Sequence, residues 1–125
     1  MTLLSEVKGH YGRIKNYVNG QWGDSESQEV LDITNPTTGK VIGQVPLSTP
    51  AEVQEAIRGA KQAFEGWRET PSMRRVQHMY RLKELMEQRA EDLARTIVQE
   101  EGKTIDEARG ETRRAIESVE VACGI

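Results

Sequence analysis

Few side chains in this chain could take part in catalysis or bind a metal, and a cysteine is the first candidate. Cys123 is the only cysteine in the 125 residues, so it is the only candidate for a thiolate nucleophile. A reactive thiolate needs a neighbouring base or cation that lowers the thiol pKa, and no His or Lys lies one turn before Cys123 in the sequence. We therefore predict that Cys123 is a small apolar residue on the face of a helix.

The two histidines and one pair of acids are the candidates for metal binding. His10 and His78 are far apart in the sequence and share no ligand spacing with the cysteine or with a pair of carboxylates. Glu100 and Glu101 come just before Gly102, and paired carboxylates at the end of a helix could hold a cation. Such acids are more often solvated, although the helix dipole disfavours negative charge at this end. The residue types therefore predict no metal site.

The glycines and the basic residues do not form a phosphate-binding motif. Gly39-Lys40 and Gly102-Lys103 lack the upstream glycine of a P-loop, and no segment matches G-x-G-x-x-G. The basic residues between positions 74 and 89 are interrupted by glutamates, which favours a solvated helix face over a nucleic-acid surface. The residues by themselves therefore predict no catalytic, cofactor-binding or metal-binding residue.

The composition is lean in apolar residues for a free-standing globular protein. Apolar residues make up 36% of the chain and aromatic residues 5%, with a net charge of −3. Two interpretations fit: an elongated helical module, or a fragment whose apolar faces pack on partners outside the chain. Nothing in the charge points to nucleic acid or an anionic membrane, and no apolar run is long enough to span a bilayer. The N-terminus lacks a signal-peptide pattern, and together with the single cysteine this predicts a cytoplasmic protein.

Two β-hairpins are expected in the first half of the chain. Asn19-Gly20 lies between two short strand-like segments, and this dipeptide favours a type I′ turn because both central residues need positive φ. Pro36 and Gly39 mark the turn between a second pair of short strands. Residues 1–14 show no clear periodicity and are expected to form an N-terminal arm.

Three amphipathic helices are expected after the hairpins, because apolar residues recur there at spacings of three and four. The expected helix starts are the capping box of Thr49 and Glu52, a cap at Thr70 or Ser72, and the capping box of Thr104 and Glu107. The second helix is expected to run without a break to Gly102, and Gly124 could end the third in the left-handed conformation. The expected fold is therefore α+β, with two small β-hairpins followed by three amphipathic helices.

The apolar faces of these helices predict which side chains are buried. Those expected to be mostly buried are Phe64, Trp67, Leu82, Leu85, Leu93 and Ile97, and those expected to be exposed are Lys83 and Glu91. If the chain lacks its packing partners, part of an apolar face should stay exposed or be covered by a second copy.

Several strings of the sequence resemble, in this order, the N-terminal part of an aldehyde dehydrogenase: YVNGQW, DITNPTTGKVIGQVPLST, AFEGWRETPSMRR and EEGKT. The resemblance covers nearly the whole chain from Asn16 onward. GQVPLST and residues 102–125 are most similar to the CoA-acylating branch, which includes methylmalonate-semialdehyde dehydrogenase. The resemblance implies that residues 15–125 are the N-terminal part of the NAD-binding domain of an α/β enzyme.

For function, the resemblance implies an enzyme that is larger than this chain. The parent protein would be an NAD-dependent dehydrogenase, a homodimer or homotetramer, that converts malonate or methylmalonate semialdehyde to acetyl-CoA or propanoyl-CoA with decarboxylation. Its nucleophile, its base and its contacts with NAD would lie beyond residue 125, so this chain by itself should be inactive. The alternatives are a hydrolytic aldehyde dehydrogenase, which uses water as acyl acceptor, and a stand-alone helical interaction module.

One further site is implied by the resemblance only. Some relatives hold a monovalent cation, and the matching positions here are Ile33 and Thr34, through backbone oxygens, and Glu100, through its carboxylate. This cation site is not counted among the predicted site residues.

Overall fold

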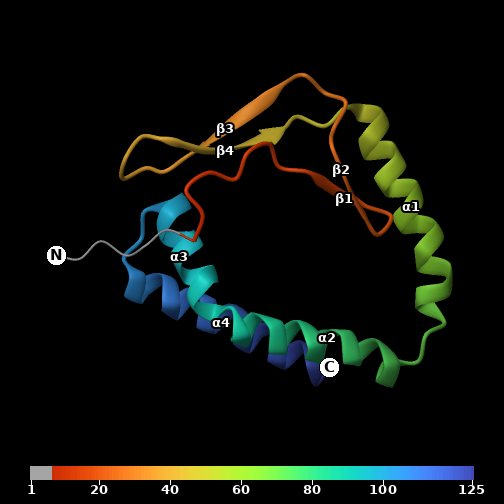
Figure 1. Ribbon diagram of the computed structural model, residues 1–125. Coiled ribbons are helices and arrows are strands. Elements are labelled where there is room, and N and C mark those ends of the chain that lie inside the picture. The colour runs from red at the N-terminus through yellow and green to blue at the C-terminus, as the bar shows by residue number, and fades with distance from the viewer. Residues whose placement is uncertain (1–6) are drawn as a thin grey trace. The chain divides into compact units, whose positions relative to one another are not determined.

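The computed structural model describes residues 7–125, which divide into two compact units. The hairpin unit consists of Gly9–Thr34 and Gly39–Thr70, and the helical unit consists of residues 7–8, Asn35–Thr38 and Pro71–Ile125. The elements, labelled in Figure 1, are β1 (Asn16–Val18), β2 (Gln21–Gly23), β3 (Val30–Thr34), β4 (Val41–Pro46), α1 (Pro50–Arg68), α2 (Ser72–Gln88), α3 (Ala90–Glu101) and α4 (Ile105–Cys123). None of the helices among the described residues is long and apolar enough to cross a membrane.

The first hairpin pairs β1 with β2 in antiparallel orientation. Its turn has a φ of 52° at Asn19 and 79° at Gly20, so the predicted turn with two positive φ angles is confirmed. Tyr17 and Trp22 face each other across the strands, with their ring centroids 4.9 Å apart. Such a cross-strand aromatic pair stabilises a hairpin whose strands are only three residues long.

The second hairpin pairs β3 with β4, also antiparallel, and confirms the predicted turn at Pro36–Gly39. Asn35 begins this turn, because its side-chain Oδ1 accepts a hydrogen bond from the backbone N–H of Thr37 at 2.9 Å. The pairing register shifts between Ile33 and Thr34, next to the turn.

Part of the predicted N-terminal arm lies along β4. The backbone N–H groups of Tyr11 and Ile14 donate to the carbonyl oxygens of Ile42 and Gln44, at 2.6 and 2.8 Å. The N–H of Gln44 in turn donates to the carbonyl oxygen of Gly12 at 2.9 Å. Residues 11–14 therefore extend the second hairpin. Residues 1–6 of the arm lie outside the described residues, and its boundary at residue 14 stays a prediction.

Helix α1 begins where its capping box predicts. The N–H of Glu52 donates to the Thr49 hydroxyl at 3.3 Å, and the Glu52 carboxylate accepts from the N–H of Thr49 at 2.7 Å.

Further along α1, a Cβ placed on Gly59 would come within 2.0 Å of the Asn19 side-chain oxygen. The tip of the first hairpin therefore packs against α1 at Gly59, where the absence of a side chain leaves space for Asn19.

The helical unit contains one helix more than predicted. The expected continuous helix to Gly102 is broken at Arg89, where φ is −114° and ψ is 18°, so that α2 and α3 are separate helices. The apolar spacing runs through the break, since Met86 and Ala90 are still four residues apart, and periodicity therefore does not reveal it. We attribute the break to packing, because the redirected α3 places Glu91 against Arg109 of α4.

Helix α4 begins as predicted, and α2 does so without the predicted cap. Thr104 is the N-cap of α4 and forms a capping box with Glu107. Helix α2 starts at Ser72, within the expected range, but its N-cap is Pro71 and no side chain caps it. The Thr70 hydroxyl instead donates to the backbone carbonyl of residue 66 in α1, at 3.1 Å.

The two glycines at helix ends behave differently. Gly102 ends α3 with a φ of 81°, the left-handed conformation that favours glycine, and a Cβ there would lie 2.9 Å from Cγ of Pro36. Gly124 has a φ of −94°, so the expected left-handed end of the last helix is wrong. Helix α4 therefore stops without the backbone reversal that Gly102 provides.

The core of the helical unit consists mainly of small side chains. Its buried residues on α3 and α4 are Ala94, Gln99, Ala108, Thr112 and Ile116. Small residues such as Ala94 and Ala108, both 0% exposed, let the two helices approach closely. The side-chain amide of Gln99 donates to the carbonyl oxygen of Lys8 at 2.9 Å, which anchors residues 7–8 to α3.

The burial prediction is wrong for most of its large residues. Phe64 is 56% exposed and Trp67 is 44% exposed, and Leu82 and Leu93 are exposed as well. Leu85 and Ile97 are half-buried, as are Lys83 and Glu91, which had been expected to be exposed. No residue of Pro50–Arg68 is buried, so most of the apolar face of α1 stays exposed, as expected for a chain without its packing partners.

Candidate functional site

Cys123 is the last residue of α4, and the neighbouring helix brings a lysine to it. It is a free, half-buried cysteine. The Lys83 ammonium on α2 donates to the Glu87 carboxylate at 2.9 Å and lies 3.8 Å from the carboxylate of Glu120. The hydrogen bond to Glu87, with smaller contributions from Glu120 and Cys123, raises the pKa of Lys83 above its ordinary value. The sequence of α4 alone does not reveal this lysine, because the packing of α2 on α4 brings Lys83 near Cys123.

Lys83 does not act as a base for the Cys123 thiol. The Lys83 ammonium is already engaged by two carboxylates, and its raised pKa keeps it protonated, so it is not a base that could take a proton from Cys123. The prediction that Cys123 has a structural role stays a prediction.

The histidines lie in different units. In the hairpin unit, Nδ1 of His10 accepts a hydrogen bond from the backbone N–H of Gly12 at 2.9 Å, which fits a turn-stabilising role. His78 is an exposed residue of α2 in the helical unit. Among residues 7–125, no group of three or more His, Cys, Asp or Glu side chains is arranged to hold a metal ion.

The three residues of the implied cation site also belong to different units. Ile33 and Thr34 lie at the register shift of β3 in the hairpin unit, and Glu100 lies in α3 of the helical unit. Glu100 is exposed, and its neighbour Glu101 pairs with the Lys103 ammonium at 3.0 Å. The cation site therefore stays a prediction.

The Glu91 carboxylate on α3 is the centre of a charge cluster in the helical unit. Arg109 of α4 donates to both of its oxygens, at 3.0 and 2.9 Å, and Arg95 donates to it at 3.1 Å. The hydrogen bond from Arg109, followed by that from Arg95, lowers the pKa of Glu91 to about 2. The spacing of Glu91 and Arg95 could have been identified in the sequence, but the two-point contact with Arg109 could not. The cluster joins α3 to α4 and leaves the carboxylate ionised.

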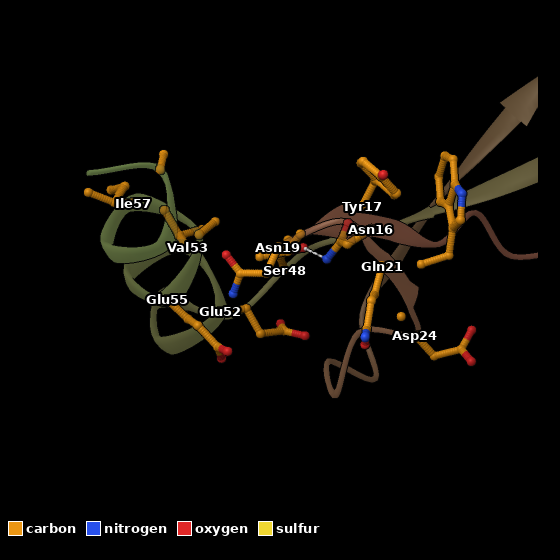
Figure 2. A pocket seen from close by; sticks show the side chains of 15 residues that line it. Asn16, Tyr17, Asn19, Gln21, Asp24, Ser48, Glu52, Val53, Glu55 and Ile57 are labelled. Atoms are coloured by element: carbon orange, nitrogen blue, oxygen red, sulfur yellow. Dashed lines mark hydrogen bonds between the residues drawn. The ribbon is translucent and has the colours of Figure 1, made fainter. Parts of the chain in front are cut away.

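A hollow in the hairpin unit lies beside the first hairpin and the first half of α1, with a volume of about 720 Å³ (Figure 2). Tyr17, Asn16 and Gln21 come from the hairpin, and Val53 and Ile57 come from α1. The dashed line in Figure 2 is the hydrogen bond that the Asn16 amide donates to the Ser48 hydroxyl at 2.8 Å. The hollow is wide and open, and it contains no sequence-predicted site residue.

Glu52 is the lining residue of this hollow with the strongest electrostatic perturbation. Its carboxylate accepts hydrogen bonds from the backbone N–H groups of Thr49 and Glu26 and from the Ser25 hydroxyl. These bonds, with that from Thr49 first, lower the pKa of Glu52 to about 2. A carboxylate that caps a helix and fixes a loop is permanently ionised near neutral pH, so it is unsuited to proton transfer.

The sequence of this chain matches that of a known protein family. A sequence profile of the aldehyde dehydrogenase family matches residues 22–125. The chain is 46% identical over 112 residues to malonate-semialdehyde dehydrogenase of Listeria innocua, an alignment that covers 90% of this chain and 23% of that protein. It is 44% identical over 121 residues to malonate-semialdehyde dehydrogenase 1 of Geobacillus kaustophilus, covering 97% of this chain and 25% of that protein.

Solved structures of aldehyde dehydrogenases also match this chain. Methylmalonate-semialdehyde dehydrogenase from Oceanimonas doudoroffii matches with a TM-score of 0.85 and 40% identity, over 91% of this chain and 23% of that chain. Aldehyde dehydrogenase C from Pseudomonas syringae, in complex with NAD+ and octanal, matches with a TM-score of 0.85 and 35% identity, over 89% of this chain and 23% of that chain. The chain thus spans about a quarter of the length of the relatives that it matches.

Proposed function

Because this chain belongs to the aldehyde dehydrogenase family, we propose that it forms the N-terminal part of an NAD-dependent, CoA-acylating dehydrogenase of malonate or methylmalonate semialdehyde. The observation that carries this proposal is the 46% identity to malonate-semialdehyde dehydrogenase over 90% of the chain. The fold likeness to a methylmalonate-semialdehyde dehydrogenase, at 40% identity, supports the same branch. In this proposal, residues 15–125 are the first part of the NAD-binding domain.

The proposed reaction oxidises the aldehyde carbon and transfers it to sulfur. Malonate semialdehyde, NAD+ and coenzyme A give acetyl-CoA, CO2 and NADH, and methylmalonate semialdehyde gives propanoyl-CoA in the same way. The aldehyde hydrogen leaves with two electrons as hydride to the nicotinamide, and a carbon–sulfur bond forms to coenzyme A. The carboxylate leaves as CO2, and the carbon that carried it gains a proton, which balances the proton released from the thiol of coenzyme A.

The described residues do not fit the NAD pyrophosphate. Pyrophosphate groups bind at helix N-termini that follow a glycine-rich loop. Among residues 7–125, the four helices start after Thr49, Pro71, Arg89 and Thr104, and none of these starts follows such a loop. We therefore derive no step of the reaction from this chain, and the proposal assigns the contacts with NAD and coenzyme A to the part of the relatives that this chain does not match.

The role proposed for this chain is that of a scaffold within the larger enzyme. Its capping boxes and its Glu91 cluster fix the helices, while the open apolar face of α1 is available to pack on the rest of the protein. The exposure of Phe64 and Trp67 favours this scaffold over a stand-alone helical module, which would bury its own apolar residues. A cytoplasmic homodimer or homotetramer remains part of the proposal.

A comparison of rates tests the proposed substrate and acceptor. The full-length protein that contains this chain is assayed for NADH formation with malonate semialdehyde, methylmalonate semialdehyde and octanal, each with and without coenzyme A. We expect the two semialdehydes to be the better substrates and turnover to rise when coenzyme A is added. Equal rates without coenzyme A would move the protein to the hydrolytic branch, and a preference for octanal would contradict the proposed substrate class.

A further inference from the structure

We draw no further inference here: the strongest candidate, the open hollow beside the β1–β2 hairpin and the first half of α1, presents exposed apolar side chains such as Trp22 and Ile57, and nothing in the structure shows what covers it.

Discussion

At the scale of single residues, the carboxylates with the most perturbed pKa values serve the fold. Glu52 caps α1 and holds the preceding loop, and Glu91 joins α3 to α4 through Arg109. Both have pKa values lowered to about 2 by hydrogen bonds that stabilise the ionised form. A shifted pKa often marks an active site, but structural ion pairs produce the same shift. Here each shift is explained by a helix cap or by a contact between helices.

The Glu91 cluster makes stability depend on pH in a defined direction. Its pKa is about 2 in the folded chain against an ordinary value of 4.5, so the stabilisation is complete above about pH 4.5 and is lost as the pH falls toward 2. We expect Glu91→Gln to lower the free energy of unfolding at neutral pH, and we expect the difference from wild type to shrink over that acidic range. Urea unfolding at a series of pH values measures it.

The matched control is Glu100→Gln on the same helix. Glu100 is exposed, so the variant should be about as stable as the wild type at neutral pH. If Glu91→Gln were as stable as Glu100→Gln at neutral pH, the proposed role of the Arg109 contact would be wrong.

Two glycines of the helical unit should respond to alanine in opposite directions. Gly102→Ala should destabilise by about 1–2 kcal/mol, because alanine is strained at positive φ. Its Cβ would also lie 2.9 Å from Pro36. Gly110→Ala lies within α4, where the nearest obstacle is the Arg114 side chain at 3.6 Å, and should stabilise by about 0.5–1 kcal/mol. Chemical denaturation of both variants measures the two changes in the free energy of unfolding. A Gly102→Ala variant that is more stable than the wild type would contradict the left-handed conformation of Gly102 at the end of α3.

At the scale of elements, short sequence motifs predict turns and helix starts, whereas contacts between elements far apart in the chain cannot be identified from such motifs. Both hairpin turns and two of three helix caps are confirmed, because Asn-Gly, the pair Pro36 and Gly39, and Thr-x-x-Glu act within a few residues. The break at Arg89 was not predicted, since it arises from packing of α3 on α4. One local hint exists: Glu91 and Asp92 are acids in the first turn of α3, as is typical of a helix start.

The caps provide a test at this scale. Thr104→Ala removes the hydroxyl that accepts from the N–H of Glu107 and should destabilise by about 1 kcal/mol. Thr70→Ala serves as the comparison, because the N-cap of α2 is Pro71 and the Thr70 hydroxyl donates to a carbonyl of α1. We expect a clearly smaller effect from Thr70→Ala in thermal unfolding. Equal losses in the two variants would count against the assignment of the caps.

At the scale of the whole molecule, the main error of the sequence prediction becomes informative. Phe64, Trp67, Leu82 and Leu93 lie on apolar stripes, and a stripe predicts burial only when its partner is present. The chain spans about a quarter of the length of its relatives, and its α1 face has no partner among the described residues. The same limit applies to the proposed reaction. The resemblance identifies a family, but the described residues supply no step of that reaction.

This chain by itself should be catalytically inactive. Hydride transfer needs the nicotinamide and the reacting carbon held within about 3.5 Å of each other, and such positioning can supply about 7–11 kcal/mol of the barrier. We expect no NADH from residues 1–125 with either semialdehyde, with the full-length protein as the positive control. Turnover by the chain that disappears in Cys123→Ala would overturn the structural role assigned to Cys123.

The central claim is that the enzyme containing this chain passes its acyl group to coenzyme A. The most direct test is to incubate the full-length protein with malonate semialdehyde, NAD+ and coenzyme A, and to quantify NADH and acetyl-CoA in the same samples. The account predicts one acetyl-CoA for each NADH, because the hydride and the acyl group come from the same substrate molecule. NADH formed with a free carboxylic acid and without acetyl-CoA would contradict it.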